Sequence, residues 1–237
     1  MRSLSSDGYD TDKSRSYLRN YDKYFADFPE PLNILELGIF HGGSLLLWRD
    51  HIQGGNVVGL DRKNVEVPDE SGRIKVYKGS QDDTALLERI GNETGPFDII
   101  IDDASHLAAE TKVGFWWLFE RHLKPGGLYV IEDWRVGYYG AWPDGKQYKQ
   151  PRDNRGLFGR ARRVRSHDFG LVGFVKQLVD ELGADAYTHP SRGSREANRL
   201  PRFRSMEFTP GQVFIVKASP EDDALVREQW AKVKSTR

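Results

Sequence analysis

Residues 33–51 read NILELGIFHGGSLLLWRDH, an apolar run that ends in glycine and leads into a helix-like stretch. The run at 34–37 has the length of a buried strand, and Gly38 stops it. Gly38, Gly42 and Gly43 would let the backbone approach a ligand closely, and the helix from Ser44 would present its N-terminal amides to that ligand. The stretch therefore indicates a strand, a ligand-binding turn and a helix.

The same pattern recurs on the C-terminal side of this stretch. Further strands are predicted at 57–60, 74–77, 97–101 and 128–131, with helices at 84–90 and 108–123 between them. Short apolar strands that alternate with helices predict a parallel sheet with helices on both faces. Near the end, runs at 203–208 and 212–216 flank Thr209-Pro210-Gly211, a turn short enough for a hairpin. The predicted fold class is α/β, a mostly parallel seven-stranded sheet with a C-terminal antiparallel hairpin.

The chain of 237 residues is long enough for one such domain with a full core. We expect an N-terminal helical segment at 1–32, in which tyrosines recur at helical spacing, and the α/β domain at 33–237. Residues 134–165 break the regular pattern with aromatic and basic residues. A long loop inside a compact domain is typical of a lid, so this segment is predicted to be a basic, aromatic lid.

The composition excludes several classes of protein. The 35 basic residues balance the 35 acidic ones, so net charge indicates no polyanionic partner for the whole chain. The absence of cysteine excludes disulfides, a thiolate nucleophile and a cysteine zinc site. The N-terminus lacks the apolar core of a signal peptide, and no apolar run approaches the roughly 20 residues of a membrane span. The expected location is the cytoplasm.

Polar residues follow the next two predicted strands at the edge where the glycine turn lies. Asp61 ends the second strand, where a carboxylate can accept hydrogen bonds from ribose hydroxyls, and Ser80 and Gln81 follow the third, where they suit an adenine edge. Nicotinamide enzymes share such features, but this turn has one glycine in its first half and departs from the dinucleotide fingerprint. The order of the later elements resembles a Rossmann-like class I methyltransferase, which uses S-adenosylmethionine.

Two pairs of acids follow two further strands. Asp102-Asp103 come after the strand at 97–101, and Glu132-Asp133 come after the strand at 128–131. In the expected strand order these ends are neighbours at the ligand-binding edge of the sheet. Single acids there often cap helices or face solvent, but gathered carboxylates repel one another unless a cation intervenes. Oxygen ligands without cysteine favour a hard ion such as Mg²⁺.

His106 lies three residues after Asp103. An isolated histidine there would usually be a packing or helix-start residue, but its acidic neighbours favour a functional role. The ordinary pKa of histidine, near neutrality, suits a general base. A hydroxyl that coordinates the metal would be acidified before it attacks a methyl group. His106 is therefore the candidate base for methyl transfer to a hydroxyl.

Several motifs together resemble the metal-dependent sugar O-methyltransferases, which include macrolide-sugar and rhamnosyl O-methyltransferases, and the cephalosporin-hydroxylase-like proteins share them. The motifs are Thr11-Asp12-Lys13 with the tyrosine-rich helix, Glu36-x-Gly38 with Gly42-Gly43-Ser44-Leu45, residues 101–106 and residues 125–133. The resemblance covers roughly residues 10–133. It implies Asp103, Glu132 and Asp133 as Mg²⁺ ligands, His106 as the base, and a cofactor site that includes Glu36, Gly38, Asp61, Ser80 and Asp102. The implied acceptor is a sugar hydroxyl on a small molecule, a glycolipid or a polysaccharide.

Other interpretations stay open at this stage. Basic residues crowd 146–165 and 192–204, and they would suit a solvated surface, an anionic acceptor or a single-stranded nucleic acid. An RNA methyltransferase is the weaker alternative, and it would show strong salt dependence and activity without Mg²⁺. A non-catalytic S-adenosylmethionine-binding protein is a further alternative, and a homo-oligomer is compatible with the sequence.

Overall fold

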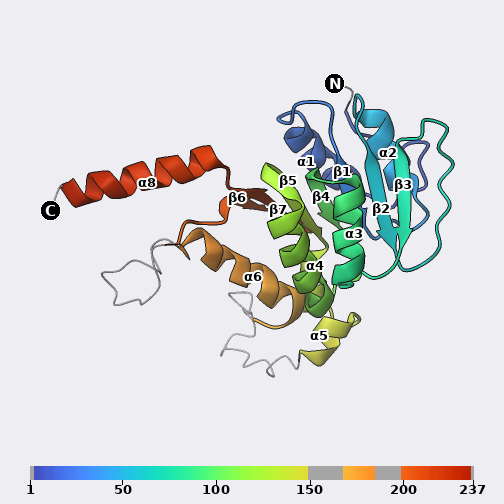
Figure 1. Ribbon diagram of the computed structural model, residues 1–237. Coiled ribbons are helices and arrows are strands. Elements are labelled where there is room, and N and C mark those ends of the chain that lie inside the picture. The colour runs from blue at the N-terminus through green and yellow to red at the C-terminus, as the bar shows by residue number, and fades with distance from the viewer. Residues whose placement is uncertain (1–2, 149–167, 185–198, 236–237) are drawn as a thin grey trace.

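The computed structural model describes residues 3–148, 168–184 and 199–235, and they surround a seven-stranded sheet in the order β3-β2-β1-β4-β5-β7-β6 (Figure 1). The strands are β1 (Ile34–Leu37), β2 (Val57–Asp61), β3 (Ile74–Lys78), β4 (Phe97–Asp102), β5 (Leu123–Glu132), β6 (Phe203–Phe208) and β7 (Gln212–Lys217). Strands β1 to β5 pair in parallel. Strand β7 runs antiparallel to both β5 and β6. The predicted fold class and C-terminal hairpin are confirmed.

Helices cover both faces of the sheet because successive strand residues point to opposite sides. Ile34 packs in a core with α1 (Arg15–Phe25) and α2 (Gly43–His51), whereas Leu35 packs in a second core with the helices of the other face. That face carries α3 (Thr84–Thr94), α4 (Ala108–Arg121) and α6 (Gly170–Leu182). Helix α8 (Pro220–Ser235) extends away from the sheet (Figure 1).

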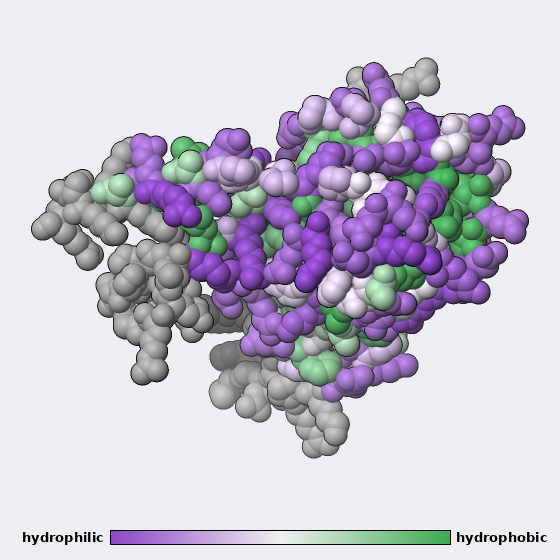
Figure 2. Space-filling model, in the orientation of Figure 1, coloured by the Kyte–Doolittle hydropathy of each residue, from purple (hydrophilic) through white to green (hydrophobic). Residues whose placement is uncertain are grey.

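The face shown in the space-filling view is mostly hydrophilic, with smaller hydrophobic areas between the hydrophilic residues (Figure 2). The described part of the chain contains no helix with both the length and the apolarity that crossing a bilayer would require.

Two expectations from the sequence need correction. Strand β5 begins at Leu123 rather than at residue 128, and its pairing with β4 has a register shift between Phe97 and Ile99. The first part of the predicted lid is not irregular, since it forms η1 (Trp134–Tyr138) and α5 (Pro143–Gln147). The rest of the lid, 149–165, and the basic residues of 192–198 lie outside the described residues.

Helix α1 is built into the core of the sheet. Ser14 caps its first turn by accepting a hydrogen bond from the Tyr17 amide. Leu18, Tyr21 and Phe25 recur on one face and are buried. The Tyr21 ring meets Trp48 edge-on, with ring centroids 5.0 Å apart. The described part of the segment 1–32, residues 3–32, therefore packs against the sheet.

Phe25→Ala tests whether α1 and the sheet unfold together. Phe25 is fully buried, so its truncation should lower the free energy of unfolding by about 3–4 kcal/mol. Urea unfolding followed by circular dichroism and tryptophan fluorescence should give one shared transition. Leu225→Ala, at a side chain that is 61% exposed, is the control and should change little. A separate early transition in Phe25→Ala would contradict this packing.

Candidate active site

The glycine turn after β1 is shaped by close backbone approaches. Gly38 has a positive φ of 80°, and a Cβ atom there would lie 2.3 Å from the carbonyl oxygen of Asp103. Glycine is therefore required where the end of β1 runs against the end of β4. At Gly43 a Cβ atom would lie 2.2 Å from the carbonyl oxygen of Asp10. The N-terminal segment thus crosses directly over the start of α2.

A first cavity of about 220 Å³ lies at this turn. Its lining includes Gly38, Asp61 and Gln81, so the structure brings together three of the residues predicted to bind the cofactor. The Asp61 carboxylate accepts a hydrogen bond from the Ile39 amide at 3.1 Å, which fixes it against the turn. The other lining residues, which the sequence did not assign to the cofactor, are Leu60, Arg62, Lys63, Gly79, Ala104 and Ser105.

The other residues predicted for the cofactor lie around this cavity rather than on its wall. Glu36 is buried and accepts hydrogen bonds from Ser44 Oγ at 2.6 Å and Trp48 Nε1 at 3.1 Å. Asp102 is buried too and accepts two long hydrogen bonds of 3.4 Å from Gln81. Their polar atoms hold the turn and the strand ends in place. Direct contact of Glu36, Gly42, Gly43, Ser44, Ser80 and Asp102 with a cofactor stays a prediction.

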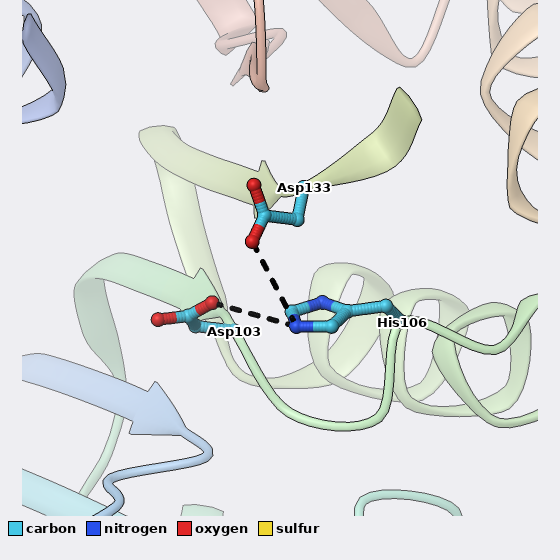
Figure 3. Close-up of side chains that lie close together, drawn as sticks. All are labelled: Asp103, His106 and Asp133. Carbon is cyan, nitrogen blue, oxygen red and sulfur yellow. Dashed lines mark ion pairs between the residues drawn. The ribbon is translucent and has the colours of Figure 1, made fainter. Parts of the chain in front are cut away.

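Asp103, His106 and Asp133 meet at the ends of β4 and β5 (Figure 3). His106 Nε2 lies 4.0 Å from Asp103 Oδ1 and 4.0 Å from Asp133 Oδ2, so the imidazole stands between the two carboxylates. His106 has a φ of 54° and Asp133 a φ of 51°, which side-chain-bearing residues rarely adopt. Such backbone conformations concentrate at functional sites, where they aim side chains at one point.

Lys13 lies at the centre of an acidic cluster, which is formed by Glu36, Asp103, Glu132 and Asp133. Its Nζ atom lies 3.0 Å from Glu36 Oε1, 2.9 Å from Asp103 Oδ2 and 3.0 Å from Glu132 Oε2. Burial alone would lower the pKa of Lys13, but the carboxylates of Asp103, Glu132 and Glu36 outweigh it and raise that pKa well above its ordinary value. Lys13 is therefore a permanent internal cation. The sequence marked it only as part of the motif at residues 11–13.

Glu132 is held by internal partners at both oxygens. Oε2 accepts from Lys13 at 3.0 Å, and Oε1 accepts a short hydrogen bond from Tyr21 and a weaker one of 3.5 Å from Gln212. Burial raises the pKa of Glu132 to about 7, and the neighbouring Asp103 adds to the shift. Among the described residues, the group whose ligand atoms lie within 4.8 Å of one another and could hold a metal ion consists of Asp103, His106 and Asp133, without Glu132. The role of Glu132 as a ligand stays a prediction.

The donor set fits a hard divalent cation. Asp103 and Asp133 offer carboxylate oxygens, and they line a second cavity of about 420 Å³ together with Asp12, Glu132 and Arg135. The remaining lining residues of this cavity are Lys13, Ser14, Ser16, Tyr17 and Pro210. Burial raises the pKa of the Asp103 carboxyl to about 6 in the absence of a metal, although Lys13 opposes this shift. A divalent cation between these groups would favour their ionised forms.

His106 is suited to accept a proton. Burial lowers its pKa, although the carboxylates of Asp133 and Glu132 act in the opposite direction. A lowered pKa favours the neutral imidazole near pH 7, which is the form that can act as a base. The Trp142 ring contacts the imidazole edge-on, with ring centroids 5.4 Å apart, and this contact limits how far the imidazole can turn.

Known proteins with similar sequences are sugar-modifying enzymes. No protein-family model matches the chain. It is 33% identical to mycinamicin VI 2''-O-methyltransferase of Micromonospora griseorubida over 202 residues. This match covers 80% of this chain and 46% of the relative. It is 35% identical over 178 residues to a tetracenomycin 3'-O-methyltransferase of Streptomyces olivaceus that acts on a 2-methoxy-α-L-rhamnosyl compound, covering 72% of this chain and 41% of the relative.

A similar solved structure is the MycE methyltransferase from the mycinamycin pathway in complex with Mg and SAH. The TM-score is 0.64 at 29% identity, and the match covers 86% of this chain and 49% of that one. The sheet order and the glycine turn are those of a Rossmann-like class I methyltransferase.

Within that class, the homologues of this chain are sugar O-methyltransferases, in line with the resemblance. The chain spans about half the length of the curated relatives that it matches.

Lys13→Met tests the internal cation. The substitution leaves three carboxylates without their shared ammonium, so the free energy of unfolding in EDTA should fall by about 3–5 kcal/mol. Added Mg²⁺ should raise the melting temperature of this variant more than that of the unchanged chain. Lys23→Met is the matched control, since its pair with Glu207 is exposed and contributes at most about 1 kcal/mol. Equal effects of the two substitutions would contradict the assignment.

Asp102→Asn tests the buried carboxyl beside the first cavity. Burial raises the pKa of Asp102 to about 7 from an ordinary value of 3.8. The folded chain thus binds the proton of the Asp102 carboxyl more tightly than the unfolded chain does. Asp102 therefore lowers the free energy of unfolding as the pH rises between these two pKa values. The asparagine side chain cannot ionise, so the free energy of unfolding of Asp102→Asn should fall by ~2 kcal/mol less between pH 5 and 8 than that of the unchanged chain. Urea denaturation in EDTA measures this, and identical pH profiles would contradict it.

Proposed function

We propose that this chain transfers the methyl group of S-adenosylmethionine to a hydroxyl of a sugar, with a divalent cation such as Mg²⁺ at the acidic cluster. The observation that carries the proposal is the meeting of Asp103, His106 and Asp133 beside the glycine-turn cavity. Two strand ends supply a candidate metal group and a candidate base next to a candidate cofactor cavity. The relatives support the same activity, since their names describe methyl transfer to sugar-bearing macrolides and tetracenomycins.

The first cavity would hold the cofactor, which supplies the methyl group. Gly38 leaves room for a ligand against the backbone, and the Asp61 carboxylate stands at the end of β2, where it can accept hydrogen bonds from ribose hydroxyls. Lys63 donates its amide to the other oxygen of Asp61 at 2.8 Å, so the carboxylate is held in one orientation. Gln81 keeps the loop after β4 in place by accepting a hydrogen bond from the Ser105 amide at 2.9 Å.

The second cavity would hold the acceptor sugar. Asp103 and Asp133, with Glu132 as the further predicted ligand, would hold the cation there. When bound, the cation supplies a Lewis acid that lowers the pKa of a sugar hydroxyl. Tyr17 donates a hydrogen bond to Asp133 Oδ1 at 2.6 Å and leaves Oδ2 facing His106. Lys13 does the same for Asp103, because it takes Oδ2 and leaves Oδ1 facing His106.

His106 Nε2 would accept the proton that the hydroxyl loses during attack on the methyl group. The nitrogen faces both carboxylates, and these stabilise the imidazolium that the proton creates. The side chain is 12% exposed, so the proton can pass on to solvent.

Further parts of the proposal concern the setting of the enzyme. We expect it to act in the cytoplasm, and we expect the sugar to belong to a small molecule, a glycolipid or a polysaccharide. An RNA acceptor would require activity without Mg²⁺ and binding that weakens strongly with salt. A non-catalytic S-adenosylmethionine-binding role would leave the Asp103, His106 and Asp133 group without a purpose.

The test is methyl transfer from labelled S-adenosylmethionine to a panel of rhamnosides and other glycosides. Thorough chelation with EDTA should remove activity, and Mg²⁺ should restore it. His106→Ala should lower kcat about 10²–10⁴-fold at a saturating acceptor while calorimetry shows unchanged binding of S-adenosylhomocysteine. His51→Ala, at the far end of α2, is the control. Activity that survives chelation would refute the metal mechanism, and near-normal turnover of His106→Ala would refute the assigned base.

A further inference from the structure

A third cavity of about 510 Å³ continues from the second. The two share the lining residues Ser16, Tyr17, Arg135 and Pro210, so they form one cleft. One end of the cleft is acidic and contains the candidate metal group. The other end lies between α1, η1 and the turn that joins β6 to β7.

The far end of the cleft has the opposite charge. The charged residues of its lining are Arg19 from α1 and Arg135 from η1, and that lining contains no carboxylate. Among the described residues, neither guanidinium has an Asp or Glu oxygen within ion-pairing distance. This differs from Arg49, Arg62 and Arg204, which all pair with carboxylates. Two arginines from different elements thus line one cavity without an ion-pair partner among the described residues.

The rest of the third cavity suits a sugar. Asn20 and Thr209 supply amide and hydroxyl groups, and the Asn20 amide is held by a hydrogen bond of 2.9 Å to Gln212. Phe208 is 44% exposed and offers an apolar surface for the C–H face of a sugar ring. The cavity therefore combines hydrogen-bonding groups, an aromatic surface and two guanidinium groups.

We propose that the third cavity binds an anionic group of the acceptor, a carboxylate or a phosphate on the unit next to the methylated sugar. This inference rests on the proposed function, because it takes the second cavity as the place of the methylated hydroxyl. Guanidinium groups bind carboxylate and phosphate oxygens through paired hydrogen bonds. The two guanidinium groups at the far end of the cleft would thus set the direction in which the acceptor lies.

The experiment compares three disaccharides by isothermal titration calorimetry, with S-adenosylhomocysteine and Mg²⁺ present. Each joins rhamnose to a glucose whose carbon 6 carries a hydroxyl, a carboxylate or a phosphate. At low salt, one or both anionic compounds should bind about tenfold more tightly than the hydroxyl compound, and the tighter one identifies the anion. The difference should shrink as salt is added. Equal affinities for all three, or no measurable binding by any, would overturn the proposal.

Two variants assign the effect to the arginines. Arg19→Gln and Arg135→Gln should each reduce the preference for the anionic compound to about threefold or less, with little change for the hydroxyl compound. Arg15→Gln is the matched control, because Arg15 is exposed on the same helix and does not line the third cavity. A loss of preference as large in Arg15→Gln as in Arg19→Gln would mean that general surface charge is responsible, and would overturn the assignment.

Methyl transfer to the same three compounds separates this inference from the proposed function. Preferential binding of an anionic compound without methyl transfer to any of them would contradict the proposed function and leave the anion site standing. Methyl transfer at equal kcat/KM for all three, with equal affinities, would contradict the anion site and leave the proposed function standing.

Discussion

The architecture of the site depends on one buried ammonium group. Glu36, Asp103 and Glu132 come from the ends of three adjacent strands, and their carboxylates would repel one another in the low-dielectric interior. Lys13 contacts all three at 2.9 to 3.0 Å. A buried charge cluster of this kind is tolerated only when each charge is compensated. Lys13 therefore allows the strand ends to gather acids, and it links Glu36, beside the glycine turn, to Asp103 of the candidate metal group.

The same ammonium compensates the cluster only in part. One positive charge faces three carboxylates, and Asp133 adds a fourth nearby, so the cluster keeps a demand for further positive charge. A divalent cation would compensate this remaining negative charge, since hard ions bind where carboxylate oxygens are gathered. One oxygen of Asp103 contacts Lys13, while the other faces His106. Under the proposed function, Lys13 would thus orient the Asp103 carboxylate toward the bound metal.

The sequence predicted the fold because its strand and helix signals are local. The acids at 102–103 and 132–133 were placed together correctly, since parallel strands that are neighbours end at the same edge of the sheet. Lys13 could not be placed in this way, because its contact with Glu132 joins residues 119 positions apart and follows from how α1 docks. The contact of Lys13 with Glu36 could not be placed for the same reason. A buried lysine leaves no periodic signal, whereas a buried strand does.

Helix α1 and the segment before it build the candidate site as well as the core. They supply Lys13 to the acidic cluster, Tyr17 to Asp133, and Arg19 to the basic end of the cleft. The sheet alone provides the glycine turn and the acids, but one wall of the second and third cavities is built from this segment. The stretches on either side of residue 32 therefore line the same two cavities. Under the proposed function, substitutions on the exposed face of α1 would alter acceptor choice, while the first cavity, lined from residue 38 onward, would stay intact.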